Sequence, residues 1–257
     1  MGDLVIPLSA VHAFMVVLAR VGGVFVFVPI PGLVAAPGPA RIVLSVSLTL
    51  ALYPKWPSGL PINPEIGEFV ALSMAEFALG VTVGLLIAFI TEMFAVAAQA
   101  ISLPAGYTYA SSVDPATQAE SNVLIILAQL VAGMLFFAFG LHRQLLLALA
   151  RSLQTHPPGE YSVSVPVAEE VLRIGSGIFE LGFELALPVL ALLAMIDISL
   201  ALLGRLNSQL QVIILSFPLK MLVSLALLAA LGSVLPRLFQ KTADRVMAVV
   251  WELLTSG

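Results

Sequence analysis

Long runs of apolar residues dominate the chain and predict helices, because each run extends well beyond the 4–8 residues of a typical buried strand. The runs cover residues 11–28, 41–53, 66–103, 123–153, 171–203 and 212–235, and a further helix is predicted at 236–254. Proline-rich or polar segments separate most of them. The pattern therefore predicts an all-α protein built from helical hairpins.

Several of these predicted helices do not have the length of a simple membrane span, which needs ~20 apolar residues. The run 41–53 is too short and suggests a packed or re-entrant helix. The run 66–103 would form a helix roughly 55 Å long against a hydrocarbon core of ~30 Å, so it either breaks or projects out of the membrane. The run 123–153 is also too long, and "GLHRQ" interrupts it. These lengths suggest helices that pack on other protein.

The last predicted helix is amphipathic, with an apolar and a charged face. The apolar face holds Leu238, Val246, Val249, Val250 and Leu253, and the largely opposite face holds Arg237, Lys241, Asp244 and Arg245. We expect it to meet the cytoplasmic membrane surface or a protein partner.

Composition places the chain among integral membrane proteins. Of 257 residues, 60% are hydrophobic and 10% are charged, whereas soluble domains have about 45–50% and about 25%. The length allows roughly five to seven spans. The chain has no cysteine, which excludes a disulfide framework or a cysteine-based metal site.

The distribution of charge predicts the orientation of the C-terminal end. Residues 65–200 carry twelve acids and three bases, whereas residues 201–257 carry five bases and two acids. By the positive-inside rule the C-terminus is cytoplasmic. The N-terminus is cytoplasmic with six spans and external with five, and both remain open.

Charged residues inside the apolar runs are the first functional candidates, because each costs about 2.5–3.5 kcal/mol on insertion scales. They are Glu76, Glu92, Glu180, Glu184, Asp197 and Lys220. One interpretation is a proton or ion path in which Asp197 pairs with Lys220 or Arg205; the other is a buried structural pair or a partner contact. Glu180 and Glu184 share a helix face and require a cation or polar interface from elsewhere.

Other motifs indicate packing rather than catalysis. "GVTVG" at 80–84 favours close helix approach, and "FPLK" at 217–220 predicts a kink because proline frees a backbone carbonyl. His12, His142 and His156 stand apart, without the spacing of metal ligands. No nucleotide-binding or hydrolase motif occurs, so neither an enzyme nor a cofactor is expected.

The stretch "GYTYASSVDPATQAESN" at 106–122 is polar and lies between two long apolar runs. Together with "GLHRQLLLALARSLQTHPPGE" and "GFELALPVLALLAMIDISLALLGRLNSQLQVIILSFPLKMLVSL", it resembles the FliR family of flagellar type III export gate proteins. The order and spacing of these segments carry the resemblance, which covers nearly the whole chain. Departures are Ser208 where proline is usual, Arg143 after His142, and tyrosine rather than phenylalanine at 107 and 109.

The resemblance implies a single domain over 1–257, with N-terminal helices at 1–103, a plug-like loop at 104–122, C-terminal helices at 123–235 and the amphipathic helix at 236–257. The plug would close a channel through Gly106, Tyr107, Tyr109, Ser112, Asp114 and Pro115. Glycine permits unusual backbone angles there, Asp-Pro favours a fixed turn, and the tyrosines add bulk and hydroxyls.

The resemblance also implies partners and a location. These are FliP-type and FliQ-type gate subunits forming a helical pore complex, FlhB-type and FlhA-type export proteins, the basal-body ring in the bacterial inner membrane, and unfolded protein cargo, with no nucleic acid. Two other functions remain open. One is the equivalent subunit of a virulence injectisome, and the other is a stand-alone proton-coupled transporter using Asp197 and Lys220.

Overall fold

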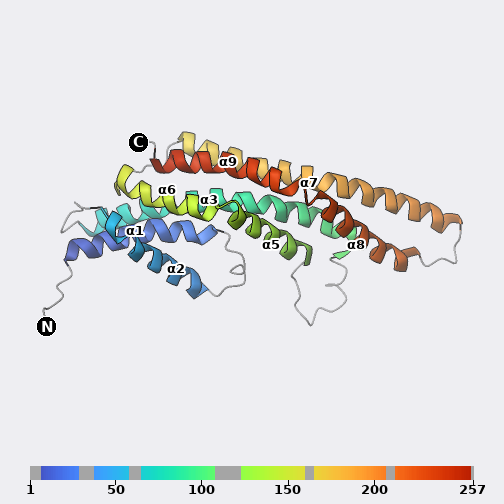
Figure 1. The fold of residues 1–257 in the computed structure, drawn as a ribbon, viewed down its shortest axis with the longest axis horizontal. Helices are drawn as coiled ribbons and strands as arrows, with labels where there is room; N and C mark the ends of the chain where they lie inside the picture. The colour runs from blue at the N-terminus through green and yellow to red at the C-terminus, as the bar shows by residue number, and fades with distance from the viewer. Residues whose placement is uncertain are drawn as a thin grey trace. The chain divides into compact units, whose positions relative to one another are not determined.

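The structure, a computed structural model, describes residues 7–28, 38–57, 65–107, 123–159, 165–206 and 212–255. Every regular element in these ranges is helical (Figure 1), which confirms the predicted all-α class. The helices are α1 Leu8–Phe27, α2 Gly38–Ala51, the short 3₁₀ helix η1 Tyr53–Lys55, α3 Ile66–Ala105, α5 Val123–Ala138, α6 Leu141–Thr155, α7 Val165–Leu206, α8 Val212–Leu231 and α9 Leu235–Thr255.

The two apolar runs that are too long for a simple span, 66–103 and 123–153, form different structures. α3 is one helix of 40 residues, so the alternative that this run breaks is wrong, and its length of about 60 Å exceeds a hydrocarbon core. The run 123–153 does break, as predicted. Gly140 lies between α5 and α6 with a φ of 68°, a left-handed conformation that glycine adopts without steric cost.

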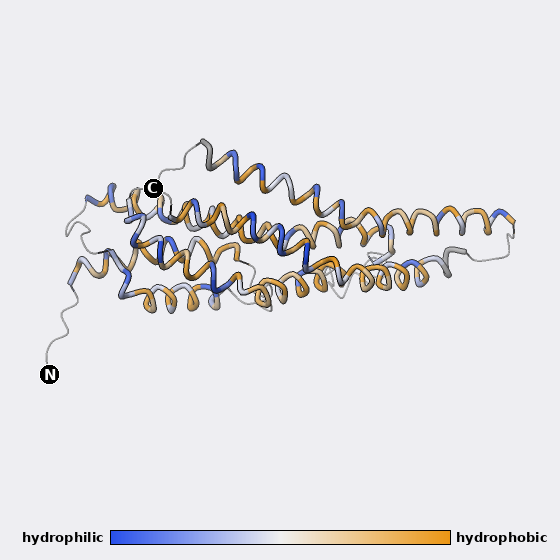
Figure 2. The backbone as a smooth tube through the Cα atoms, turned by 45° about the horizontal axis from the view of Figure 1, so that its top comes forward, coloured by the Kyte–Doolittle hydropathy of each residue, from blue (hydrophilic) through white to orange (hydrophobic). Residues whose placement is uncertain are grey.

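Three described helices, α1, α3 and residues Ala168–Leu206 of α7, are long and apolar enough to cross a membrane. The number rises to five if each of the bent pairs α5–α6 and α8–α9 counts as one span. Hydrophobic positions dominate the tube in Figure 2, and the hydrophilic positions of α7 are concentrated in its first half. A membrane protein with several spans is therefore confirmed, whereas α2, with 14 residues, is too short to cross alone.

The helices group into two compact units. Unit 1 consists of Met1–Phe89, Phe136–Gly175 and Thr242–Gly257, and unit 2 consists of Ile90–Leu135 and Ser176–Lys241. Each unit has its own buried apolar core, and each contains one of the two polar clusters discussed below.

In unit 1, α1 and α3 approach closely through glycines. A Cβ atom at Gly80 would collide with the backbone oxygen of Arg20, and one at Gly84 would collide with that of Val24. On the α1 side, a Cβ at Gly23 would lie 2.5 Å from the backbone oxygen of Phe77. The interpretation of "GVTVG" as a packing motif is confirmed, because any side chain at these positions would force the helices apart.

In unit 2, small side chains allow α3 and α7 to pack tightly. The core cluster joins both helices and the start of α5, and it contains Ala97, Ala98, Ile101, Ala105, Leu124, Ala186, Val189 and Leu193. Gly182 of α7 continues this contact, since a Cβ there would lie 2.7 Å from a methyl carbon of Val96. This core fixes the end of α3, where the candidate site begins.

α9 has the predicted amphipathic character. Val246 and Val250 are buried, and Arg237, Lys241, Asp244 and Arg245 are exposed. The charged face is therefore available to water, lipid headgroups or a partner.

Candidate functional site

The candidate site lies in unit 2, where α3 ends and the predicted plug begins. α3 ends at Ala105, and Gly106 follows with a φ of 87°, a conformation that side chains other than glycine rarely adopt. A Cβ atom at Gly106 would also lie 2.5 Å from a ring carbon of Phe217 on α8. Backbone conformation and packing therefore both require glycine at this position.

Tyr107 ties the end of α3 to α8. Its hydroxyl donates to the backbone oxygen of Met221 at 3.1 Å and lies 3.3 Å from the hydroxyl of Ser224. Ser224 is fully buried and donates to the same carbonyl at 2.9 Å. A phenylalanine could not make these bonds, so the tyrosine in this sequence adds a polar anchor at the first residues of the predicted plug.

The same part of α8 carries a proline and a buried cation. Pro218 has no N–H and therefore leaves one helical carbonyl without its usual donor. Two residues later, the ammonium group of Lys220 forms an ion pair with the carboxylate of Asp197 on α7. The side chain of Lys220 is 10% exposed and that of Asp197 is 52% exposed, so the lysine depends on this pair more than the aspartate does.

Substitutions of this ion pair are expected to have unequal effects. Asp197→Asn leaves a buried ammonium without a counter-charge and should lower the free energy of unfolding by about 1–3 kcal/mol. Lys220→Met leaves a half-exposed carboxylate and should cost less, whereas Lys220→Arg should retain most of the stability. Denaturation in mild detergent measures the difference, and a larger loss for Lys220→Met than for Asp197→Asn would contradict this assignment.

Removing the hydroxyl of Tyr107 is expected to loosen the end of α3 without unfolding the chain. Tyr107→Phe should cost about 0.5–1.5 kcal/mol, the usual net value of a hydrogen bond. Hydrogen exchange of the amides around Gly106 measures the local loss of protection. Tyr53→Phe is the matched control, because Tyr53 is 65% exposed. Equal exchange in both variants would show that the hydroxyl anchors nothing.

The other predicted site residues are not brought together. Within this chain Glu92 on α3 and Glu180, Glu184 and Arg205 on α7 are all exposed. Tyr109, Ser112, Asp114 and Pro115 lie outside the described residues. The interpretation of the exposed acids as partner contacts stays a prediction.

Unit 1 contains a second polar cluster that sequence reasoning missed. The guanidinium of Arg20 on α1 donates to the carboxylate of Glu76 on α3 at 2.5 Å, and both side chains are completely buried. It also donates to the hydroxyl of Ser152 at 3.0 Å and the backbone oxygen of His156 at 3.1 Å. Three segments that are distant in the sequence therefore meet at one guanidinium.

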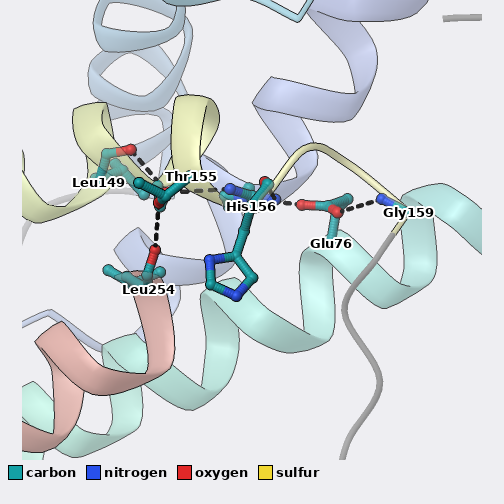
Figure 3. Close-up of polar contacts among 8 residues, drawn as sticks. Glu76, Leu149, Thr155, His156, Gly159 and Leu254 are labelled. Atoms are coloured by element: carbon teal, nitrogen blue, oxygen red, sulfur yellow. Dashed lines mark hydrogen bonds and ion pairs between the residues drawn. The ribbon is translucent and has the colours of Figure 1, made fainter. Parts of the chain in front are cut away.

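Figure 3 shows how the second carboxylate oxygen of Glu76 is used. It accepts from the backbone N–H of Gly159 at 3.1 Å, so both oxygens have a partner. Nearby, the hydroxyl of Thr155 donates to the backbone oxygen of Leu254 on α9 at 3.0 Å. Burial of an ion pair is costly unless the remaining hydrogen-bonding groups of both partners are also satisfied. The bonds of Arg20 and Glu76 meet this condition and connect α1, α3, α6 and the turn after α6.

The sequence does contain a signal for this cluster. Arg20 is the single charged residue of the first apolar run and Glu76 is the first acid deep within the third. A buried charge requires an opposite charge, but their pairing depends on the register of α1 on α3, which the sequence does not supply.

No group of three or more histidine, cysteine, aspartate or glutamate residues that could hold a metal ion occurs in the part of the chain that the structure describes. The site residues form hydrogen bonds and ion pairs that hold neighbouring helices together.

α7 presents a large uncovered apolar surface. Only 17% of its most apolar stretch is buried, against 67% for α3. Its exposed large side chains are Leu172, Phe179, Phe183, Leu187, Met195, Ile198, Leu202, Leu203 and Leu206. Glu180 and Glu184 lie among them without an ion pair to any described residue. An exposed apolar surface of this size contacts either lipid or another protein. The two acids favour a protein partner with basic side chains, because ionised carboxylates are costly in hydrocarbon.

Comparison with known proteins identifies relatives along almost the whole chain. The family model described as "Bacterial export proteins, family 1" matches residues 11–246. The flagellar biosynthetic protein FliR of Escherichia coli K12 is 29% identical over 226 residues, which is 87% of this chain and 85% of that protein. FliR of Pectobacterium carotovorum is 28% identical over 84% of this chain and 82% of that protein. FliR of Bacillus subtilis is 25% identical over 87% of each chain.

Proposed function

Because this chain belongs to family 1 of the bacterial export proteins, we propose that it is a structural pore subunit of the flagellar type III protein export gate. The observation that carries the proposal is similarity to proteins named FliR over 84–87% of the chain. It serves flagellum assembly and the export of flagellar proteins across the bacterial inner membrane.

The surface of α7 supports a role within an assembly. A lone lipid-facing helix would gain nothing from Glu180 and Glu184, because ionised groups in hydrocarbon are costly. Helices of FliP-type and FliQ-type subunits with basic side chains would neutralise both acids and cover the exposed phenylalanines and leucines. FlhB-type and FlhA-type proteins, the basal-body ring and unfolded cargo are the further partners.

The segment after α3 is the gate in this proposal. Residues 106–122 close the channel of the assembled complex, and Gly106 and Tyr107 hold the start of this segment on α8. The contacts of Gly106 with Phe217 and of Tyr107 with Met221 support a fixed attachment point. The Lys220–Asp197 ion pair also supports it, by fixing α8 on α7. The protein acts without catalysis, and the basic face of α9 orients the C-terminus toward the cytoplasm.

Deletion of the gene in its own bacterium tests the proposal. We expect loss of swimming, of filaments and of secreted hook and filament proteins, and a plasmid copy should restore all three. Normal flagella in the deletion strain would contradict the proposal. Normal flagella with loss of injected effector proteins would instead support the injectisome alternative.

The transporter alternative makes a different prediction for the purified chain. A stand-alone transporter using Asp197 and Lys220 would move protons in vesicles that contain this chain alone. The proposed gate subunit would not, because its channel requires other subunits. Proton flux that disappears in Asp197→Asn would favour the transporter.

A further inference from the structure

Unit 2 contains a partly open apolar cavity of about 550 Å³ between α3, α5, α7, α8 and the first residues of α9. Every residue that lines it is glycine or has an apolar side chain; Ile101, Leu124, Ala128, Leu135, Leu228 and Pro236 mark its extent. Typical ligand sites have about 300–1,000 Å³, and an apolar cavity of about 150 Å³ already stays dry and binds benzene. The cavity therefore suits a hydrocarbon ligand rather than water.

The cavity is long. Its lining on α5 extends from Leu124 to Leu135, which is about 16 Å along a helix axis. A single hydrocarbon chain fits a cavity of this length and volume.

The cavity is also accessible from the side. Leu127 of α5 and Leu225 of α8 both line it, and they are 45% and 41% exposed. Where these residues face lipid, an acyl chain can enter between α5 and α8 without crossing water.

Basic side chains lie at one end of the cavity. Leu235 and Pro236 line that end, and the exposed Arg237 follows them directly, with the exposed Lys241 one turn later on the same face of α9. Phe94 of α3 is at this end too, since its ring lies 5.9 Å from that of Phe239. Neither basic side chain forms an ion pair with a described residue of unit 2.

The described acids of unit 2 are on other helices. Glu92 is exposed and lies about 160° around α3 from Phe94. Glu180, Glu184 and Asp197 are on α7, and Asp197 pairs with Lys220. On α9, Asp244 lies one turn after Lys241 on the same face and about 10 Å from Arg237 along the helix. With Arg237, Lys241 and Arg245 against Asp244, this exposed face of α9 carries a net positive charge.

We propose that this cavity binds an anionic phospholipid, with one acyl chain between α3, α5 and α8 and the phosphate on Arg237 and Lys241. Moving an acyl chain from the bilayer into an apolar cavity changes its free energy little, because both surroundings are hydrocarbon. Selectivity for this lipid therefore comes from its charge, with each basic residue contributing roughly five-fold in affinity. Such a site requires only that the chain is a membrane protein and does not depend on its flagellar role.

Photolabelling in lipid nanodiscs tests the site. The full-length chain is placed in phosphatidylcholine discs that contain a trace of phosphatidylglycerol carrying a diazirine in one acyl chain, irradiated and digested. We expect labelled peptides from α5 and α8, and roughly five-fold less labelling in each of Arg237→Gln and Lys241→Gln. Arg151→Gln is the matched control, because Arg151 is exposed on α6 in unit 1, and it should label like the wild type.

The cavity itself is tested by Ala128→Phe, which should abolish labelling of α5. The surface variants at Arg237 and Lys241 keep the test valid if this core variant does not fold. Excess inorganic phosphate should not compete, because it lacks the acyl chain.

Three results would overturn the proposal. The first is equal labelling by the phosphatidylcholine version of the probe, which would mean that charge plays no part. The second is labelling confined to the exposed face of α7. The third is loss of labelling when the chain is purified with its protein partners, which would mean that a partner covers the cavity.

Discussion

Replacing Arg20 with methionine is expected to lower the free energy of unfolding by about 3–5 kcal/mol, because it leaves a buried carboxylate without its cation. The carboxylate of Glu76 is completely buried, so water cannot replace the guanidinium. The same substitution removes the donors to Ser152 and to the carbonyl of His156. Denaturation of the purified chain in mild detergent measures the loss.

A double substitution separates charge from packing. Arg20→Met with Glu76→Leu removes both charges, and replacing a buried pair by apolar residues of similar volume is often neutral or stabilising. We therefore expect the double variant to recover most of the stability. Arg151→Met is the control on an exposed position and should stay within about 0.5 kcal/mol of the wild type. If the double variant is as unstable as Arg20→Met, the ion pair is not the cause.

Replacing Gly106 with valine is the second substitution with a large expected effect. A left-handed backbone costs roughly 1–2 kcal/mol for residues with a side chain, and forcing extra atoms into a packed site costs about 1–3 kcal/mol. Both apply at Gly106, because its φ is 87° and an added Cβ would lie 2.5 Å from a ring carbon of Phe217. We expect a less stable chain and loss of flagellar protein secretion, measured by the amount of filament protein in culture medium.

A second change distinguishes the two causes. Gly106→Val with Phe217→Ala removes the clash but not the strained backbone, so it should recover stability only in part. Gly177→Val is the matched control, because Gly177 lies on α7 in unit 2 and a Cβ there would meet nothing within 4 Å. Secretion at the wild-type level in Gly106→Val would contradict the role of this residue as an attachment point.

The sequence predicts the helices well because their cause is local. Continuous apolar runs and the break at Gly140 depend on neighbouring residues alone. The boundary predicted between residues 235 and 236 lies within a few residues of the observed break between α8 and α9. The sequence leaves the unbroken length of α3 open, because whether so long a helix survives depends on what packs against it.

The sequence predicts the candidate site less completely because pairing depends on register. Asp197 and Lys220 stand out as possible partners, since both are charges in apolar runs. Arg20 and Glu76 are also charges in apolar runs, but the sequence does not show that they pair with each other. Gly80 and Gly84 indicate a closely packed helix, but the sequence does not say that α1 is the helix they contact. Tyr107 is a predicted plug residue, whereas its bond to Met221 cannot be inferred from the sequence.

The exposed acids of α7 indicate contacts with other subunits. Glu180 and Glu184 share one face of the helix and have no cation among the described residues. Under the proposed function, basic groups of partner subunits neutralise them. Glu184→Lys should therefore weaken the assembly while leaving the isolated chain stable.

The most direct measurement is the mass of the complex that a tagged copy of this chain brings down from its own bacterium in mild detergent. We expect one copy of this chain together with several copies of FliP-type and FliQ-type subunits. Recovery of the chain alone, from cells that make those subunits in normal amounts, would contradict the role of this chain as a gate subunit.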